Sequence, residues 1–328
     1  MNKASFSIVY MGTPEFAVAP LRALLDAGCM VVGVVTAPDK PAGRGMKLQA
    51  SPVKQFAVER GLPVLQPEKL KDDSFLEALR AWKADLQVVV AFRMLPEVVW
   101  SMPARGTFNL HASLLPQYRG AAPIHWAVMN GDSETGVTTF MLQQAIDTGD
   151  VLLQASIPIG PTENTGSVHD RLMELGAAVV VRTVDLLLEG AIRPQPQHEL
   201  TVFDSILRPA PKLFKDNTCM DWTRDGRSLF NFVRGLSPFP AAWSTLVPLV
   251  GSGEEAVTVK LFEAGFIEEE HALMPGTVVT DHKKILQVAV KDGFLSLLRL
   301  QSAGRKQLGV EEWLRGFPAV DGWMFKSR

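Results

Sequence analysis

Three polar residues in the middle of the chain have the types and the spacing that acyl-transfer chemistry needs. Asn109 and His111 are two positions apart in a strand-like segment, so their side chains point to the same face. Asp147 follows a second strand-like segment, in the sequence Asp-Thr-Gly-Asp. An amide can donate to a developing oxyanion, an imidazole can donate or move protons, and a carboxylate can keep that imidazole protonated and oriented. We therefore predict that Asn109, His111 and Asp147 are the catalytic residues.

The same residues also have ordinary structural interpretations. A single histidine near the end of a strand is more often a packed or capping residue than a catalyst, and Asp-Thr-Gly-Asp is a common turn sequence. The residues by themselves leave both interpretations open. The catalytic interpretation requires a fold that brings the ends of the two strand-like segments, and with them the three side chains, close together.

Strand-like and helix-like segments alternate along the first two-thirds of the chain. Apolar segments at 6–10, 30–36, 64–65, 86–92 and 136–142 predict strands, and amphipathic segments at 15–27, 52–60, 74–83, 122–129 and 168–188 predict helices. This alternation is typical of an α/β fold with a doubly wound, mainly parallel, Rossmann-like sheet. In such sheets ligands bind in loops at the carboxyl ends of the strands.

The pattern changes after a proline-containing connector. Short alternating runs at 257–262, 276–280, 285–290 and 294–300, separated by turn residues, predict a small OB-like β-barrel. We therefore divide the chain into a catalytic domain at 1–189, a linker at 190–207 and a second domain at 208–328.

Composition excludes several classes of protein. The chain has 328 residues, of which 47% are hydrophobic, and its net charge of −2 does not indicate a nucleic-acid binder. No apolar run is long enough to span a membrane, and no long apolar signal core begins the chain. Two distant cysteines and scattered histidines predict neither disulfides nor a metal site. The low cysteine count leads us to expect a cytoplasmic protein. Because no coiled-coil heptad is present, we also expect a monomer.

A longer motif surrounds the three polar residues. It runs Asn109-Leu110-His111, then Ser113-Leu114-Leu115-Pro116 with Arg119-Gly120-Ala121, and finally Asp147-Thr148-Gly149. This combination resembles the shared signature of the formyltetrahydrofolate-dependent formyltransferases. The resemblance implies a formyl transfer in which Asn109, His111 and Asp147 are catalytic and 10-formyltetrahydrofolate is the donor co-substrate, without a metal.

The resemblance extends over nearly the whole chain. Met11 to Phe16, the loop from Asp39 to Leu48, Ala210-Pro211-Lys212 and the segment from Leu300 to Lys306 are similar to the members that formylate the methionine amine of initiator methionyl-tRNA. It implies a second domain that binds tRNA. It also implies contacts of basic side chains with the RNA, at Lys40, Arg44, Lys47, Lys212, Arg305 and Lys306.

The resemblance also implies two folate-binding segments. They are Phe92, Arg93, Met94 and Leu95, and Ser113, Leu114, Leu115 and Pro116. The first segment departs from the Ala-Tyr-Gly form that is commoner in the family, so its pterin contacts are the least defined of these expectations. The glycine-rich loop at 43–45 lacks the Gly-Lys-Ser/Thr ending of a P-loop, so we expect no nucleotide cofactor.

Two other functions remain open at this point. A related folate enzyme that formylates a sugar-nucleotide amine, or one that hydrolyses formyltetrahydrofolate, would share Asn109, His111 and Asp147 but would not need the loop at 39–48. A non-catalytic RNA-binding protein on an enzyme scaffold would have no reason to retain all three residues.

Overall fold

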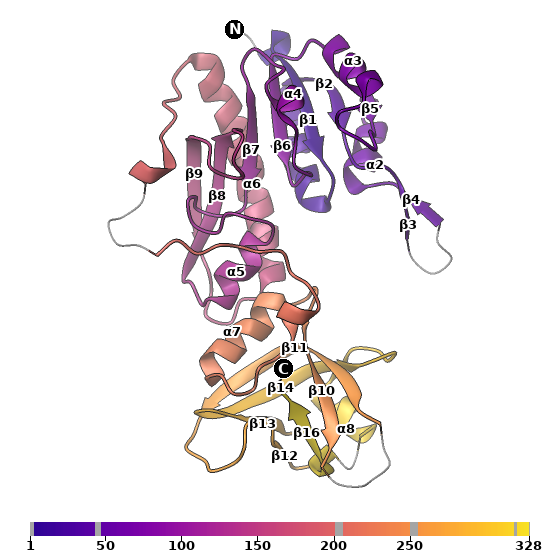
Figure 1. Ribbon diagram of the computed structural model, residues 1–328, viewed down its shortest axis with the longest axis vertical. Coiled ribbons are helices and arrows are strands. Elements are labelled where there is room, and N and C mark those ends of the chain that lie inside the picture. Colours follow the sequence, from indigo (N-terminus) through magenta and orange to yellow (C-terminus); the bar gives the residue numbers. More distant parts are fainter. Residues whose placement is uncertain (1–2, 43–46, 201–205, 250–254, 318–319, 328) are drawn as a thin grey trace. The chain divides into compact units, whose positions relative to one another are not determined.

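A computed structural model describes residues 3–42, 47–200, 206–249, 255–317 and 320–327. These residues form two compact units, shown in Figure 1. The first contains residues 1–123, 135–157 and 169–209, and the second contains residues 124–134, 158–168 and 210–328. Within the described residues, no helix combines the length and the apolar character needed to cross a bilayer.

The first unit contains a sheet with the strand order β5-β2-β1-β6-β7-β8-β9. In chain order its strands are β1 (Ser7–Gly12), β2 (Met30–Val35), β5 (Val64–Leu65), β6 (Leu86–Val90), β7 (Thr107–His111), β8 (Glu134–Met141) and β9 (Val151–Pro158). The pairs from β5 to β7 are parallel, whereas β7 and β8 are antiparallel. The predicted doubly wound, mainly parallel sheet is therefore confirmed.

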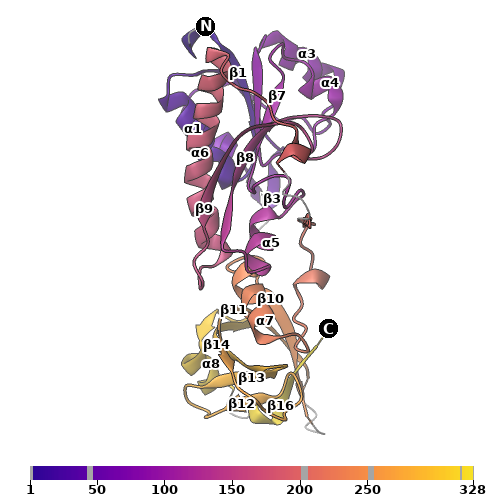
Figure 2. The ribbon, with the colours of Figure 1, turned by 90° about the vertical axis from the view of Figure 1, so that its left-hand side faces the viewer.

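Helices cover both faces of this sheet. They are α1 (Val18–Asp26), α2 (Pro52–Glu59), α3 (Asp73–Ala81), α4 (Glu97–Trp100) and α6 (Thr165–Glu189), whereas α5 (Pro123–Met129) belongs almost wholly to the second unit. Figure 2 shows α1 and α6 on one side of the sheet and α3 and α4 on the other. On the α3 side, Phe75, Leu76 and Leu79 pack with Val9 and Val89 in one core, so the strands are buried from both faces.

A separate hairpin leaves the carboxyl end of β2. It consists of β3 (Lys40–Ala42) and β4 (Lys47–Gln49) and projects from the sheet in Figure 1. Its base is fixed by two contacts: the hydroxyls of Thr36 and Ser51 are 2.7 Å apart, and Lys54 Nζ lies 2.6 Å from Asp39 Oδ2. The hydrogen bond from Lys54 lowers the pKa of the Asp39 carboxyl below its usual value.

The second unit is an antiparallel barrel that is nearly closed. Its elements are α7 (Gly226–Leu236), β10 (Ala242–Pro248), β11 (Val257–Glu268), β12 (Val278–Thr280), β13 (Leu286–Val290), β14 (Gly293–Ser302), β15 (Leu308–Gly309), α8 (Val310–Arg315) and β16 (Trp323–Lys326). The strand order is β12-β13-β14-β11-β10-β16, and a bridge between Thr277 and Met324 brings the two ends of the sheet together. The predicted small barrel is confirmed, while α7 was not predicted.

Trp222 lies in the core of this barrel. Its side chain is fully buried, and its indole N–H donates to Ser244 Oγ at 3.0 Å. Trp313 and Trp323 are buried in the same core. These residues pack the barrel interior, as expected for large aromatic side chains.

Candidate active site

The candidate site begins at the carboxyl end of β7. This strand lies between β6, to which it is parallel, and β8, to which it is antiparallel. Asn109 is paired with Val89 and Phe140, and His111 is paired with Thr138. Because the two residues alternate with Leu110, both side chains face the same side of the sheet.

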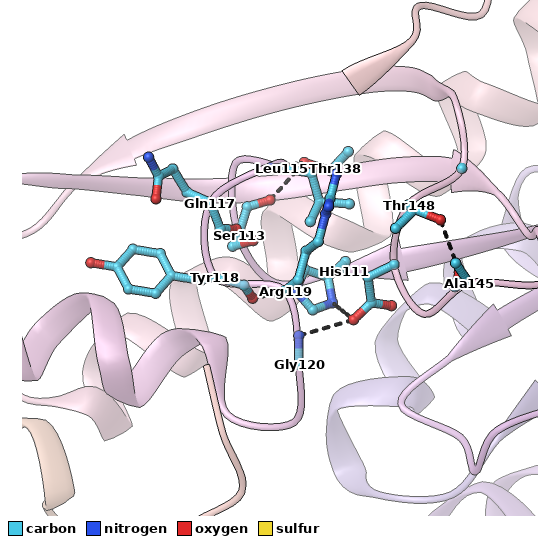
Figure 3. A network of polar contacts seen from close by, with 12 residues as sticks. His111, Ser113, Leu115, Gln117, Tyr118, Arg119, Gly120, Thr138, Ala145 and Thr148 are labelled. Atoms are coloured by element: carbon cyan, nitrogen blue, oxygen red, sulfur yellow. Dashed lines mark hydrogen bonds and ion pairs between the residues drawn. The ribbon is translucent and has the colours of Figure 1, made fainter. Parts of the chain in front are cut away.

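The orientation of His111 is set by one main-chain carbonyl. The side chain is buried, and its Nε2 lies 2.9 Å from the carbonyl oxygen of Tyr118. A carbonyl oxygen only accepts hydrogen bonds, so Nε2 must carry a proton in this arrangement. Nδ1 is then the nitrogen left for chemistry. It lies 3.9 Å from Asp147 Oδ2. Figure 3 shows the His111 ring beside the loop that contains Gly120.

Asp147 lies in a tight loop between β8 and β9. Its φ angle is +53°, which is uncommon for a residue other than glycine, and its Oδ2 accepts a 3.0 Å hydrogen bond from the main-chain N–H of Gly120. The Gly149 backbone passes so close to β8 that a Cβ atom there would lie 1.6 Å from the carbonyl oxygen of Met141. The glycine of the Asp-x-Gly motif is therefore a steric requirement of the loop that holds Asp147.

Asn109 is half-buried and lies two residues before His111 on the same face of β7. Its side-chain amide has no hydrogen-bond partner among the residues that the structure describes. A half-buried amide that is not occupied by the protein can donate to a ligand oxygen. The structure thus brings the three predicted catalytic residues together on one edge of the sheet; their roles in catalysis stay a prediction.

The loop after His111 has a fixed shape. Ser113 Oγ donates to the carbonyl of Gln117 at 2.6 Å, and the Thr138 hydroxyl bonds both the carbonyl of Ser113 and the N–H of Leu115. The Leu115–Pro116 peptide bond is cis. Ser113, Leu115 and Pro116 are buried and Leu114 is half-buried. Their predicted contact with folate stays a prediction, and this burial leaves mainly the loop backbone for it.

The other predicted folate segment follows β6. Arg93 donates to the carbonyl oxygens of Pro67 and Glu68, so its guanidinium is held beside the turn that follows β5. Met94 is exposed, whereas Leu95 is buried in the core below α4. Arg93 lines a cleft of about 670 Å³ at the carboxyl ends of β1, β2 and β6.

The predicted RNA contacts fall on both units. Lys40 is exposed on β3 and also lines this cleft. Arg44 and the side chain of Lys47 lie outside the described residues. Lys212, Arg305 and Lys306 are exposed on the second unit. A contact of any of them with RNA stays a prediction.

Sequence reasoning missed the residues that hold the catalytic loops. Tyr118 supplies the carbonyl for His111, and Gln197 bonds the main chain on either side of Thr148. In the sequence Gln197 is one polar residue of a proline-containing connector, and its burial, which points to a structural role, is visible only in the structure. Among the described residues, no group of three His, Cys, Asp or Glu side chains could hold a metal ion.

Comparison with known proteins first identifies the class. Residues 6–184 match the family described as formyl transferase, and residues 212–318 match the formyl transferase C-terminal domain. Methionyl-tRNA formyltransferase of Bacteroides fragilis is 58% identical over 327 residues and that of Bacteroides thetaiotaomicron is 59% identical over 323 residues. The alignments cover 100% of both chains in the first case, and 98% of this chain and 99% of its relative in the second. The chain belongs to the methionyl-tRNA formyltransferase family.

Solved structures share the fold at lower identity. HypX from Aquifex aeolicus in complex with tetrahydrofolic acid is 20% identical with a TM-score of 0.60, covering 95% of this chain and 47% of HypX. An N-formyltransferase from Helicobacter canadensis in complex with folinic acid and dTDP-3-aminofucose is 14% identical with a TM-score of 0.62, covering 92% of this chain and all of that one. Both likenesses establish the two-unit fold of this chain.

Proposed function

We propose that this protein transfers the formyl group of 10-formyltetrahydrofolate to the α-amino group of methionine on initiator methionyl-tRNA. The product is N-formylmethionyl-tRNA, the form used in translation initiation. The observation that carries this proposal is the meeting of Asn109, His111 and Asp147 at one edge of the sheet, in a chain 58% identical to a methionyl-tRNA formyltransferase over its full length.

The reaction is an acyl transfer without a covalent enzyme intermediate. The neutral methionine amine attacks the formyl carbon, a C–N bond forms, and the carbonyl electron pair moves onto oxygen. Asn109 donates a hydrogen bond to this oxyanion. The bond from carbon to the folate nitrogen then breaks as the oxyanion collapses. The proton lost by the amine ends on that departing nitrogen.

His111 and Asp147 act on these protons through one ring atom. Since Nε2 is occupied by the Tyr118 carbonyl, Nδ1 is the nitrogen that donates to the oxyanion or relays a proton. Asp147 Oδ2, 3.9 Å from Nδ1, stabilises the charged imidazole and accepts from a bridging water. The Gly120 N–H keeps that carboxylate oxygen in place.

The basic residues give the large substrate its own contacts. Four of these side chains are exposed, so they can reach phosphates without leaving the protein interior: Lys40, Lys212, Arg305 and Lys306. Phosphate contacts position an RNA but do not read its sequence. The acceptor end would then lie at the first unit, with the second unit binding the stem.

The test is formyl transfer from 10-formyltetrahydrofolate to charged initiator methionyl-tRNA, measured by acid–urea gel separation of the formylated product. We expect transfer to methionyl-tRNA and none to uncharged tRNA. A dTDP-amino sugar offered in place of the tRNA tests the sugar-nucleotide alternative. Folate turnover without formylated tRNA would contradict the proposal and indicate hydrolysis or another amine.

Replacing Lys40 with alanine is expected to raise the KM for methionyl-tRNA several-fold and leave the KM for the folate unchanged. Each phosphate contact that is lost also flattens the dependence of tRNA binding on salt, by about one unit in the log–log slope. Steady-state kinetics measure the two KM values, and filter binding from 50 to 200 mM salt measures the slope. Arg182→Ala, which removes an exposed charge from α6, is the matched control. An equal loss of folate affinity would contradict this division of contacts.

Replacing Asn109 with alanine is expected to lower kcat about 100-fold, because one oxyanion donor is lost. Asn109→Asp keeps the shape of the side chain but replaces the donor with an acceptor, so it should be at least as impaired. Steady-state kinetics with both substrates saturating measure the effect. A fall confined to KM would mean that Asn109 binds the ground state and not the oxyanion.

A further inference from the structure

Gln197 is a buried residue in the connector that the proposed mechanism does not use. It begins a short 3₁₀ helix, Gln197–Glu199, and its side chain is 4% exposed. Its Nε2 donates to the carbonyl oxygens of Asp147 and Gly149, at 2.9 and 2.8 Å. Its Oε1 accepts from Arg119 Nε at 3.0 Å and from Arg119 Nη2 at 2.6 Å.

The polarity of this arrangement leaves one orientation for the amide. A guanidinium group only donates and a carbonyl oxygen only accepts, so Oε1 must face Arg119 and Nε2 must face the two carbonyls. Both hydrogens of the amide and its oxygen are then engaged. Glutamate at this position would still pair with Arg119 but would place an acceptor against two carbonyl oxygens.

The amide connects the two loops that set the position of the Asp147 carboxylate. One partner, Arg119, precedes Gly120, whose N–H holds Asp147 Oδ2. The other partners are the main-chain carbonyls of Asp147 itself and of Gly149. These contacts also support a backbone with a φ angle of +53° at Asp147, which is unfavourable without surrounding constraints.

Arg208, which directly follows the linker, supports the other proposed catalytic residue. The carbonyl of Arg208 accepts from the N–H of Tyr118 at 2.7 Å, and Gln117 Oε1 accepts from the N–H of Arg208 at 2.9 Å. Tyr118 is the residue whose carbonyl orients His111. Gln197 and Arg208 therefore contact the supports of both Asp147 and His111, within one compact unit.

We propose that Gln197 is a positioning residue for formyl transfer, which holds the Asp147 carboxylate at its distance from His111 Nδ1. This inference rests on the proposed function. Misplacement of a reacting group by about 1 Å can lower a rate about 100-fold. Gln197 touches no substrate in this proposal, so its effect is expected on kcat and not on the binding of folate or tRNA.

The test compares Gln197→Met and Gln197→Glu with the wild-type chain. Methionine keeps the length of the side chain and removes all four contacts, whereas glutamate removes only the two to the carbonyls. We expect kcat to fall about 10- to 100-fold in both variants, with both KM values little changed. Gln87→Met is the matched control: Gln87 is equally buried and accepts a hydrogen bond from Thr107, away from the Asp147 loop. Thermal denaturation of all three variants measures the general loss of stability.

A double-mutant cycle with Asp147→Asn separates positioning from a general structural role. If Gln197 acts through the Asp147 carboxylate, Gln197→Met should lower the single-turnover rate by no more than about twofold in the Asp147→Asn background. The same 10- to 100-fold fall in both backgrounds would overturn the proposal, as would a Gln197→Met chain as active as the Gln87→Met control. The wild-type rate tests the proposed function separately. If the wild-type chain transfers no formyl group, the proposed function is wrong, whereas the contacts of Gln197 with Arg119 and the Asp147 loop are unaffected.

Discussion

Replacing His111 with alanine is expected to lower kcat for methionyl-tRNA formylation by about 1,000- to 10,000-fold. The imidazole contributes both a proton-transfer group and a charge that stabilises the oxyanion, and proton transfer alone is worth up to about 10,000-fold. The variant also removes the hydrogen bond between the His111 ring and the Tyr118 carbonyl, which is one of the contacts of the loop after β7. Single-turnover formylation with excess enzyme measures the residual rate.

Two controls make this result interpretable. His169→Ala removes a histidine of α6 that packs against the Phe16 ring, and it should retain wild-type kcat. Filter binding of methionyl-tRNA to His111→Ala should match the wild type, because no RNA contact is assigned to the buried ring. A His111→Ala rate within tenfold of wild type would remove His111 from the mechanism.

Replacing Asp147 with asparagine is expected to lower kcat about 1,000-fold. The amide oxygen of asparagine can still accept from the Gly120 N–H, so the loop should keep its shape. What is lost is the negative charge 3.9 Å from His111 Nδ1, and with it the stabilisation of the charged imidazole. The fall should therefore appear in kcat, without a matching loss of stability in thermal denaturation.

The control for this variant lies in the same loop. Asp150→Asn makes the same chemical change three residues away, where the main chain of Asp150 accepts from the Met141 N–H. We expect nearly full activity from it. If both variants were equally impaired, the loop would need a negative charge in general, and the specific pairing of Asp147 with His111 would be wrong.

The helices and strands that position the site could be predicted where apolar residues form a continuous run or recur at a helical spacing. The continuous apolar run at 30–36 became β2, and the helix expected at 168–188 became α6. β9 was missed because it begins directly after the Asp147 loop and its outer half is partly exposed, which weakens its alternation. α7 was missed because two glycines and two arginines interrupt its apolar residues, although Asp225 caps its first turn through the N–H of Ser228.

The candidate catalytic residues could be selected from the sequence because their spacing is local. Asn109 and His111 share a strand, and Asp147 is part of a three-residue motif. The residues that hold them could not be predicted in this way. Gln197 is 50 residues from Asp147 and 78 from Arg119, and two of its partners are main-chain carbonyls, which every residue type offers. Contacts of this kind leave no periodic pattern.

The composition of the second unit has a consequence for exchanging parts between relatives. Residues 124–134 and 158–168 belong to that unit although they precede the connector in sequence, and Met129 is part of the barrel's own core. Within the same unit, the Thr165 hydroxyl donates to the carbonyl of Gly235 in α7. A hybrid enzyme that took only residues 210–328 from a relative would therefore combine a foreign barrel with two native segments fitted to the original one. Recombination at a single point in this chain separates residues that pack against each other. A functional exchange therefore has to transfer residues 124–134, 158–168 and 210–328 together.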